Sequence, residues 1–186
     1  MTKIKERNCV IISPHCGNEY LGCSTILSET KEIITICDCG EQRTNETKKC
    51  AGFFGIPTIS FLGFKKGRVF DSLNILKDKL NYFLLNYTNL DNITVYLPNP
   101  WEQHLDYKTV SMIGSLVCKE LNLKVKYYSV WTILSCYSDM VDIDKNAKIS
   151  EFKKLYPSQS NIAERVILRF EEFLDMNKMM EKASLK

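Results

Sequence analysis

The chain has 186 residues, of which 45% are hydrophobic, and this is enough to build the core of one domain covering residues 1–186. Its 25 lysines and arginines and 22 aspartates and glutamates give a formal net charge of +3, without the dense basic tract that favours a nucleic-acid partner. The apolar runs are too short for a membrane span or a signal peptide, so we expect a cytoplasmic protein with neither a membrane span nor bound nucleic acid.

Short apolar runs bounded by glycine, proline or asparagine predict β-strands, in chain order, at residues 8–13, 32–37, 56–62, 93–97 and 123–129. Helical spacing of apolar residues predicts the helices between and after them. These residues are Leu73, Leu76, Leu80, Phe83 and Leu84 behind a cap at Asp71, then Val110, Ile113, Val117 and Leu121 behind Asp106, and finally Ile162, Val166, Phe170 and Phe173 in a helix that closes the chain. The alternation predicts an α/β fold, a Rossmann-like three-layer sandwich with a mainly parallel sheet and helices on both faces.

Histidine occurs only twice, and each ring follows a predicted strand. His15 lies in the polar segment 13–19, and His104 lies in the polar segment 101–107. Ligands of parallel sheets bind beyond the carboxyl ends of the strands, so we expect both rings to meet the loop at 38–43 there. His15 is therefore interpreted as a ligand or pocket residue.

Several segments carry a recognisable order of motifs. Residues 12–23 read Ile-Ser-Pro-His-Cys-Gly-Asn-Glu-Tyr-Leu-Gly-Cys, residues 38–41 read Asp-Cys-Gly-Glu, and residues 43–46 read Arg-Thr-Asn-Glu. Residues 104–107 read His-Leu-Asp-Tyr, and residues 156–159 read Tyr-Pro-Ser-Gln. This order resembles that of the PIG-L/LmbE-type N-deacetylases, with their His-Pro-Asp-Asp-Glu, Thr-Asp-Gly-Glu, Arg-x-x-Glu, His-Pro-Asp-His and late Ser-Gln motifs. The resemblance spans most of the chain and implies the same Rossmann-like fold.

The resemblance implies a zinc ion held at the positions of His15, Asn18 and Tyr107, with a general base at the position of Gly17. In this chain only His15 is a natural zinc ligand, because an amide oxygen and a neutral phenol bind zinc poorly. Glycine cannot accept a proton, and the loss of a positioned base lowers a rate by roughly 10²- to 10⁴-fold. We therefore expect a degenerate zinc site and a compromised form of the family's N-deacetylation.

The ligand-holding residues match the family better. The resemblance implies substrate contacts at Arg43 and Glu19, and a carbonyl-polarising role for His104 with Asp106 as its orienting partner. Trp101, beside two prolines, is a candidate floor of a sugar-binding cleft, although an aromatic that pins its loop is the alternative. The implied partner is a small molecule, an N-acylated amino sugar or a related glycoconjugate.

Cysteine chemistry offers an alternative function. Eight cysteines in a chain of this length are expected to be reduced thiols. Cys16 stands at a turn into a helix, whose amino end favours a thiolate, and with His104 and Asp106 it would supply a nucleophile, a base and an orienter for metal-independent acyl or glycosyl transfer. The other interpretation of Cys16 is a packing residue.

Two further interpretations stay open. Cys37 and Cys39, with His15 and Cys16, form a Cys/His set of the kind that zinc prefers, or else they simply alternate at a strand end. The remaining cysteines fall within apolar patterns and are predicted to pack, namely Cys9, Cys23, Cys50, Cys118 and Cys136. The chain is also compatible with a pseudoenzyme or partner subunit that keeps the pocket, or the fold alone, without turnover.

Overall fold

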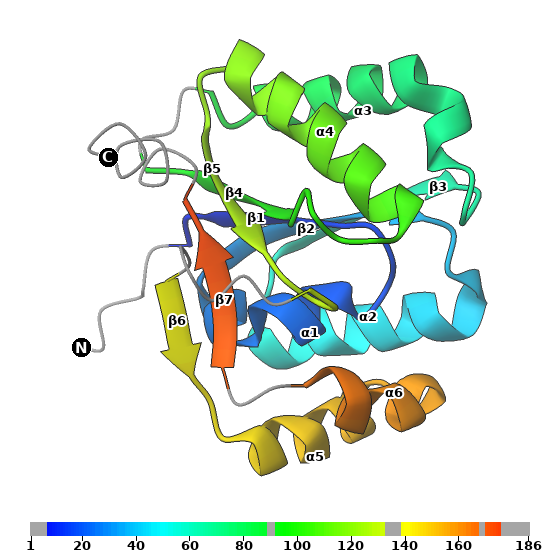
Figure 1. The fold of residues 1–186 in the computed structure, drawn as a ribbon, viewed down its shortest axis with the longest axis vertical. Helices are drawn as coiled ribbons and strands as arrows, with labels where there is room; N and C mark the ends of the chain where they lie inside the picture. Colours follow the sequence, from blue (N-terminus) through cyan, green and yellow to red (C-terminus); the bar gives the residue numbers. More distant parts are fainter. Residues whose placement is uncertain (1–6, 89–91, 133–138, 168–169, 176–186) are drawn as a thin grey trace.

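The computed structural model describes residues 7–88, 92–132, 139–167 and 170–175. Within these residues seven strands form one mixed sheet in the order β3-β2-β1-β4-β5-β7-β6 (Figure 1). The strands are β1 (Cys9–Ser13), β2 (Thr30–Cys37), β3 (Thr58–Phe64), β4 (Thr94–Pro98), β5 (Lys124–Tyr128), β6 (Asp139–Asp142) and β7 (Phe170–Leu174). Strands β1 to β5 pair in parallel, whereas β7 runs antiparallel to both β5 and β6. The predicted mainly parallel sheet is confirmed.

Helices cover both faces of the sheet, which confirms the predicted three-layer arrangement (Figure 1). Helices α3 and α4 lie on one face; α1 and α2 lie on the other, with α5 and α6 packed beyond them. The helices are α1 (Asn18–Cys23), α2 (Gly40–Phe54), α3 (Leu73–Leu85), α4 (Leu105–Glu120), α5 (Lys145–Leu155) and α6 (Ser160–Val166), with short 3-10 turns η1 (Ser24–Glu29), η2 (Val69–Ser72) and η3 (Pro157–Gln159). No helix of the described residues is both long and apolar enough to span a membrane.

Strand β1 is buried on both faces because a helical layer covers each of them. Cys9 and Ile11 pack into the core shared with α1 and α2, while Val10 and Ile12 pack into the core shared with α3 and α4. A strand that is covered on both sides reads as a continuous apolar run instead of an alternating one. This explains why the run Cys-Val-Ile-Ile predicts the central strand so directly.

The predicted closing helix is wrong. Helix α6 ends at Val166, and Phe170 and Phe173 belong to β7, which pairs with β5 and β6. In β7 the buried carboxylate of Glu171 accepts hydrogen bonds from the backbone N–H groups of Ser24 and Thr25, at 2.7 and 3.1 Å. Helical spacing in a short apolar segment cannot exclude a strand, and here the long-range pairing decides the structure.

Two predicted helix caps are also displaced. Helix α3 begins behind Ser72, and Asp71 lies in η2, where its carboxylate accepts a hydrogen bond from Arg68 at 2.6 Å. The cap of α4 is His104, whose Nδ1 accepts a hydrogen bond from the backbone N–H of Asp106 at 3.1 Å. Asp106 is therefore in the first turn of α4, and its carboxylate is available for the site described next.

Candidate functional site

A cavity of about 310 Å³ opens at the carboxyl edge of the parallel strands. From β1 the chain adds β2 and β3 on one side of the sheet, and it then returns to add β4 and β5 on the other side. Open α/β sheets bind ligands at such a switch point, which here lies between β1 and β4. The residues predicted from the sequence that line it are His15, Asn18, Arg43, His104 and Tyr107. Leu21, Lys66, Gln103, Trp131, Gln159 and Ile162 complete the lining. The two histidines meet as predicted, with ring centroids 5.2 Å apart in an edge-to-face arrangement.

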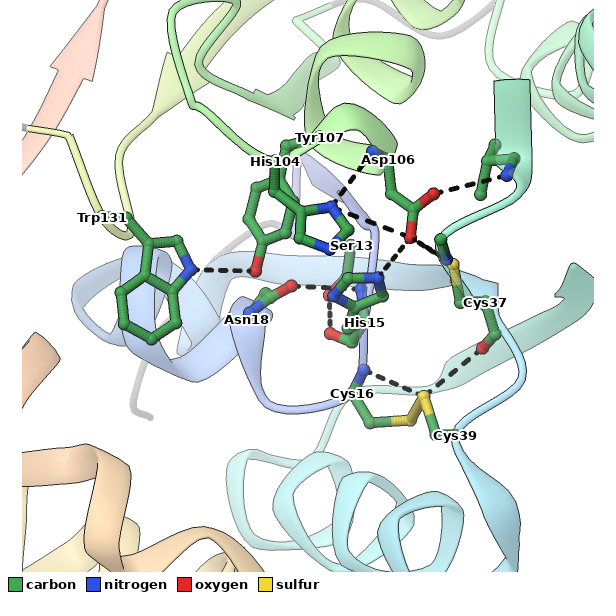
Figure 2. Close-up of polar contacts among 12 residues, drawn as sticks. Ser13, His15, Cys16, Asn18, Cys37, Cys39, His104, Asp106, Tyr107 and Trp131 are labelled. Atoms are coloured by element: carbon green, nitrogen blue, oxygen red, sulfur yellow. Dashed lines mark hydrogen bonds and ion pairs between the residues drawn. A yellow bond between two sulfur atoms is a disulfide. The ribbon is translucent and has the colours of Figure 1, made fainter. Parts of the chain in front are cut away.

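His15, which lines the cavity, forms a buried pair with Asp106 (Figure 2). The Nε2 of His15 lies 2.9 Å from Oδ2 of Asp106, and that carboxylate also accepts hydrogen bonds from the N–H groups of Gly67 and Val69. Burial lowers the pKa of His15 to about 4, despite the opposing effect of Asp106. Burial raises the pKa of Asp106, but the hydrogen bonds from Gly67, His15 and Val69 outweigh it and keep this pKa below its usual value.

These pKa directions fix the protonation of the pair at neutral pH. His15 is neutral and Asp106 is ionised, so Nε2 of His15 carries the proton and donates it to the carboxylate. The lone pair of the ring then lies on Nδ1. In the same way, Nδ1 of His104 accepts from the backbone N–H of Asp106, and the proton of a neutral His104 ring is on Nε2. Asp106 orients both rings, one through its side chain and one through its backbone.

Asn18 and Tyr107 stand beside His15 but provide no anionic oxygen. The Oδ1 of Asn18 accepts a hydrogen bond from the backbone N–H of His15 at 3.1 Å. The hydroxyl of Tyr107 accepts from Nε1 of Trp131 at 3.3 Å, and burial raises the pKa of this phenol. Tyr107 is therefore neutral at physiological pH, and the amide of Asn18 is neutral at any pH.

The described residues do not fit a zinc site of the kind the resemblance implies. His15, His104 and Asp106 place one ligand atom each within 4.8 Å of one another, so proximity alone would allow a metal. However, Nε2 of His15 and Oδ2 of Asp106 are already hydrogen-bonded to each other, and Nδ1 of His104 is the cap of α4. Zinc prefers imidazole, thiolate and carboxylate ligands, and the buried neighbours Asn18 and Tyr107 offer none of these.

The position of the family's general base is filled from another part of the chain. Gly17 has φ of +95°, and a Cβ there would lie 2.8 Å from Nε2 of Gln159. That amide donates to the carbonyl of Cys16 at 3.2 Å, and its oxygen accepts a hydrogen bond from Arg43. Gln159 thus occupies the space into which a side chain at position 17 would extend.

Glu19 is placed differently from its predicted substrate contact. Its side chain is buried outside the cavity lining, and its carboxylate accepts hydrogen bonds from the N–H of Gly17 at 3.1 and 2.9 Å and from the hydroxyl of Ser13 at 3.0 Å. Thr47 and Tyr156 donate to the same carboxylate. Glu19 therefore fixes the turn that presents His15 and Asn18.

The expectation that all eight cysteines are reduced is wrong, because Cys16 and Cys39 form a disulfide (Figure 2). This bond joins the turn after β1 to the loop after β2. The predicted nucleophilic role of Cys16 requires a free thiol, which the disulfide removes, and the Asp106 carboxylate is hydrogen-bonded to the ring of His15. The predicted thiolate metal set likewise loses two of its sulfur ligands, while the thiol of Cys37 is buried and contacts Asp106 at 3.7 Å.

The other cysteines behave as packing residues where they are described. Cys9, Cys23, Cys50 and Cys118 are buried free thiols, as predicted. Cys136 lies outside the described residues.

The aromatic wall of the cavity comes from a different tryptophan than the one predicted. Trp101 lies outside the cavity lining, and its backbone N–H donates to Asn99 at 2.8 Å. Trp131, which follows β5, lines the cavity instead. Lys66 similarly follows β3. Their position just beyond parallel strands was a usable signal, but the sequence alone does not show which loop residues turn inward.

Comparison with known proteins places this fold among deacetylases. The chain matches no family model, and no curated protein matches it. Among solved structures it is similar to the conserved protein TT1542 from Thermus thermophilus, at 16% identity and a TM-score of 0.67, covering 90% of this chain and 94% of that one. It is also similar to N,N'-diacetylchitobiose deacetylase from Pyrococcus horikoshii, at 14% identity and a TM-score of 0.62, covering 94% and 85%.

A third similar structure is the zinc-inhibited form of teicoplanin deacetylase Orf2, at 10% identity and a TM-score of 0.63, covering 83% of this chain and 84% of that one. The resemblance found in the motifs is thus confirmed at the level of the fold. Sequence identities as low as these support a shared fold and nothing more. What the site does has to be argued from its own residues.

Proposed function

We propose that this protein binds an N-acylated amino sugar or a related small glycoconjugate in the deacetylase-type cavity, and that it does so without the family's zinc-dependent N-deacetylation. The observation that carries the proposal is that the cavity keeps side chains able to hold a sugar, while the positions of the base and of two metal ligands hold residues unsuited to those roles. The similarity of the fold to that of N,N'-diacetylchitobiose deacetylase supports the ligand class. The residues at the base and metal positions, Gly17, Asn18 and Tyr107, argue against hydrolysis by a metal-activated water.

The cavity retains what is needed to hold such a ligand. Leu21, Ile162 and Trp131 supply apolar surface for a sugar ring, and Gln103 and Arg43 supply hydrogen-bond donors. The Nε2–H of His104 is suited to donate to an amide carbonyl, because Nδ1 is fixed as the acceptor at the start of α4. Binding and orientation of an N-acyl group therefore need no metal.

A combined binding and turnover assay tests the proposal. The protein, incubated with zinc, is offered N-acetylglucosamine, and both heat of binding and released acetate are measured. We expect saturable binding with no acetate release above a protein-free control, and weaker binding by His104→Ala. Sustained acetate release that requires zinc would show that the site is hydrolytic, and absence of binding by N-acetylglucosamine and also by its 6-phosphate would refute the ligand class.

A further inference from the structure

The cavity has an unbalanced charge. Its lining includes two cationic side chains, Arg43 and Lys66, and two histidines, but none of the lining residues that the structure describes is acidic. They reach it from different directions, since Arg43 lies in α2 and Lys66 follows β3. Two like charges in one small cavity repel each other unless a counter-charge lies nearby. The presence of both cations in this lining therefore requires an explanation.

Three buried carboxylates beside the lining residues do not provide that counter-charge. Asp106 is held behind His15 by the backbone N–H groups of Gly67 and Val69 and by the His15 ring. Glu102 is buried and accepts hydrogen bonds from the N–H groups of Val130 and Trp131, at 2.7 and 3.0 Å.

Glu19 is buried in the first turn of α1, with donors around both oxygens. These three carboxylates are therefore already hydrogen-bonded to groups of the protein, and none of them lines the cavity.

The cations keep donors available for a ligand. One Nη of Arg43 donates to Gln159, but Nε of Arg43 is buried without a hydrogen-bond partner among the described residues. Lys66 is exposed at the cavity mouth and carries three N–H donors. Its loop is fixed by the 2.7 Å hydrogen bond from the neighbouring N–H of Gly67 to Asp106. Guanidinium and ammonium groups placed in this way suit carboxylate or phosphate oxygens.

From this geometry we infer that the cavity selects an anionic ligand, an amino sugar that carries a carboxylate or phosphate group, with Arg43 and Lys66 as the residues that determine this specificity. The inference rests on the proposed function, because it keeps the sugar ring on the apolar wall near Trp131. It adds that the anionic oxygens lie between the two cations. A neutral sugar fills the same wall but leaves both charges uncompensated.

Calorimetric titration with three probes tests the inference: N-acetylglucosamine, N-acetylglucosamine 6-phosphate and N-acetylmuramic acid. We expect at least one anionic sugar to bind about tenfold or more tightly than the neutral one, with an affinity that falls as salt concentration rises. Lys66→Gln should remove most of this preference. Lys65→Gln, which changes the adjacent exposed lysine outside the lining, should retain it.

Arg43→Lys is a second variant, which retains the charge but not the planar fork, and it should lower affinity for the anionic sugar more than for the neutral one. Equal affinity for all three sugars, or an anionic preference that survives both Lys66→Gln and Arg43→Lys, would overturn the inference and leave the proposed function standing. Failure of all three sugars to bind would overturn both. The two anionic probes also distinguish a carboxylate from a phosphate ligand.

Discussion

Replacement of Gly17 by alanine should destabilise the protein more than the same change at Gly40. Both glycines have positive φ, +95° and +73°, so an alanine at either position incurs backbone strain of about 1–2 kcal/mol. At Gly40 no atom of the described residues lies within 4 Å of the new Cβ, whereas at Gly17 Nε2 of Gln159 lies at 2.8 Å. Displacing Gln159 weakens its hydrogen bonds to Cys16 and Arg43, so we expect Gly17→Ala to be less stable than Gly40→Ala by about 2 kcal/mol.

Urea unfolding at neutral pH measures this difference directly. The free energy of unfolding is compared for the wild type, Gly17→Ala, Gly40→Ala and Gln159→Ala, together with the double variant Gly17→Ala/Gln159→Ala. Removal of the Gln159 side chain relieves the contact, so the Gly17 substitution should cost about as much as the Gly40 one in that background. Equal losses for the two single glycine variants would refute the conclusion that Gln159 fills the space beside position 17.

Three other perturbations probe the site. The pKa of His15 is about 4 in the folded protein and 6.5 in an unfolded chain, so the unfolded state binds more protons between these pH values and stability falls as the pH is lowered. Between pH 7.5 and pH 5, the free energy of unfolding of the wild type, measured in urea, should fall by about 2 kcal/mol more than that of His15→Gln. Equal falls would contradict the lowered pKa of His15. Asp106→Asn should lower the free energy of unfolding by about 2–4 kcal/mol, against at most about 1 kcal/mol for the exposed Asp71→Asn, and similar losses would argue against a buried anchoring carboxylate. Under oxidising conditions Cys16→Ser should have a free energy of unfolding about 3 kcal/mol below that of the wild type, since the disulfide closes a separation of 23 residues. Under reducing conditions the difference between the variant and the wild type should be far smaller. The same difference under both conditions would mean that the disulfide does not form in solution.

The central sheet was predictable because its residues obey local rules. A strand such as Cys9–Ser13, covered by helices on both faces, shows a continuous apolar run, and its carboxyl end locates His15. Strand β7 was not predictable in the same way, because its pairing with β5 and β6 and the burial of Glu171 are long-range features. The apolar spacing of residues 162–173 is compatible with either kind of element.

The site was predictable in its location more than in its contacts. Motif order brought His15, Asn18 and Tyr107 together correctly, because these residues are fixed by the ends of β1 and the start of α4. The predicted pairing of Asp106 with His104 is present, through the backbone N–H of Asp106, but the sequence does not show that the Asp106 carboxylate also hydrogen-bonds to His15. Side-chain direction at helix starts depends on packing that spacing alone does not specify.

The central claim, that this cavity is not a zinc site, is tested most directly by zinc stoichiometry. The protein is purified, incubated with zinc, desalted and analysed for bound metal beside His15→Ala, with unfolding of both followed to confirm that they are native. The account predicts much less than one zinc per chain for the wild type and no difference in the variant. One zinc per wild-type chain, lost in His15→Ala, would contradict it and would make the His15, His104 and Asp106 cluster a metal centre.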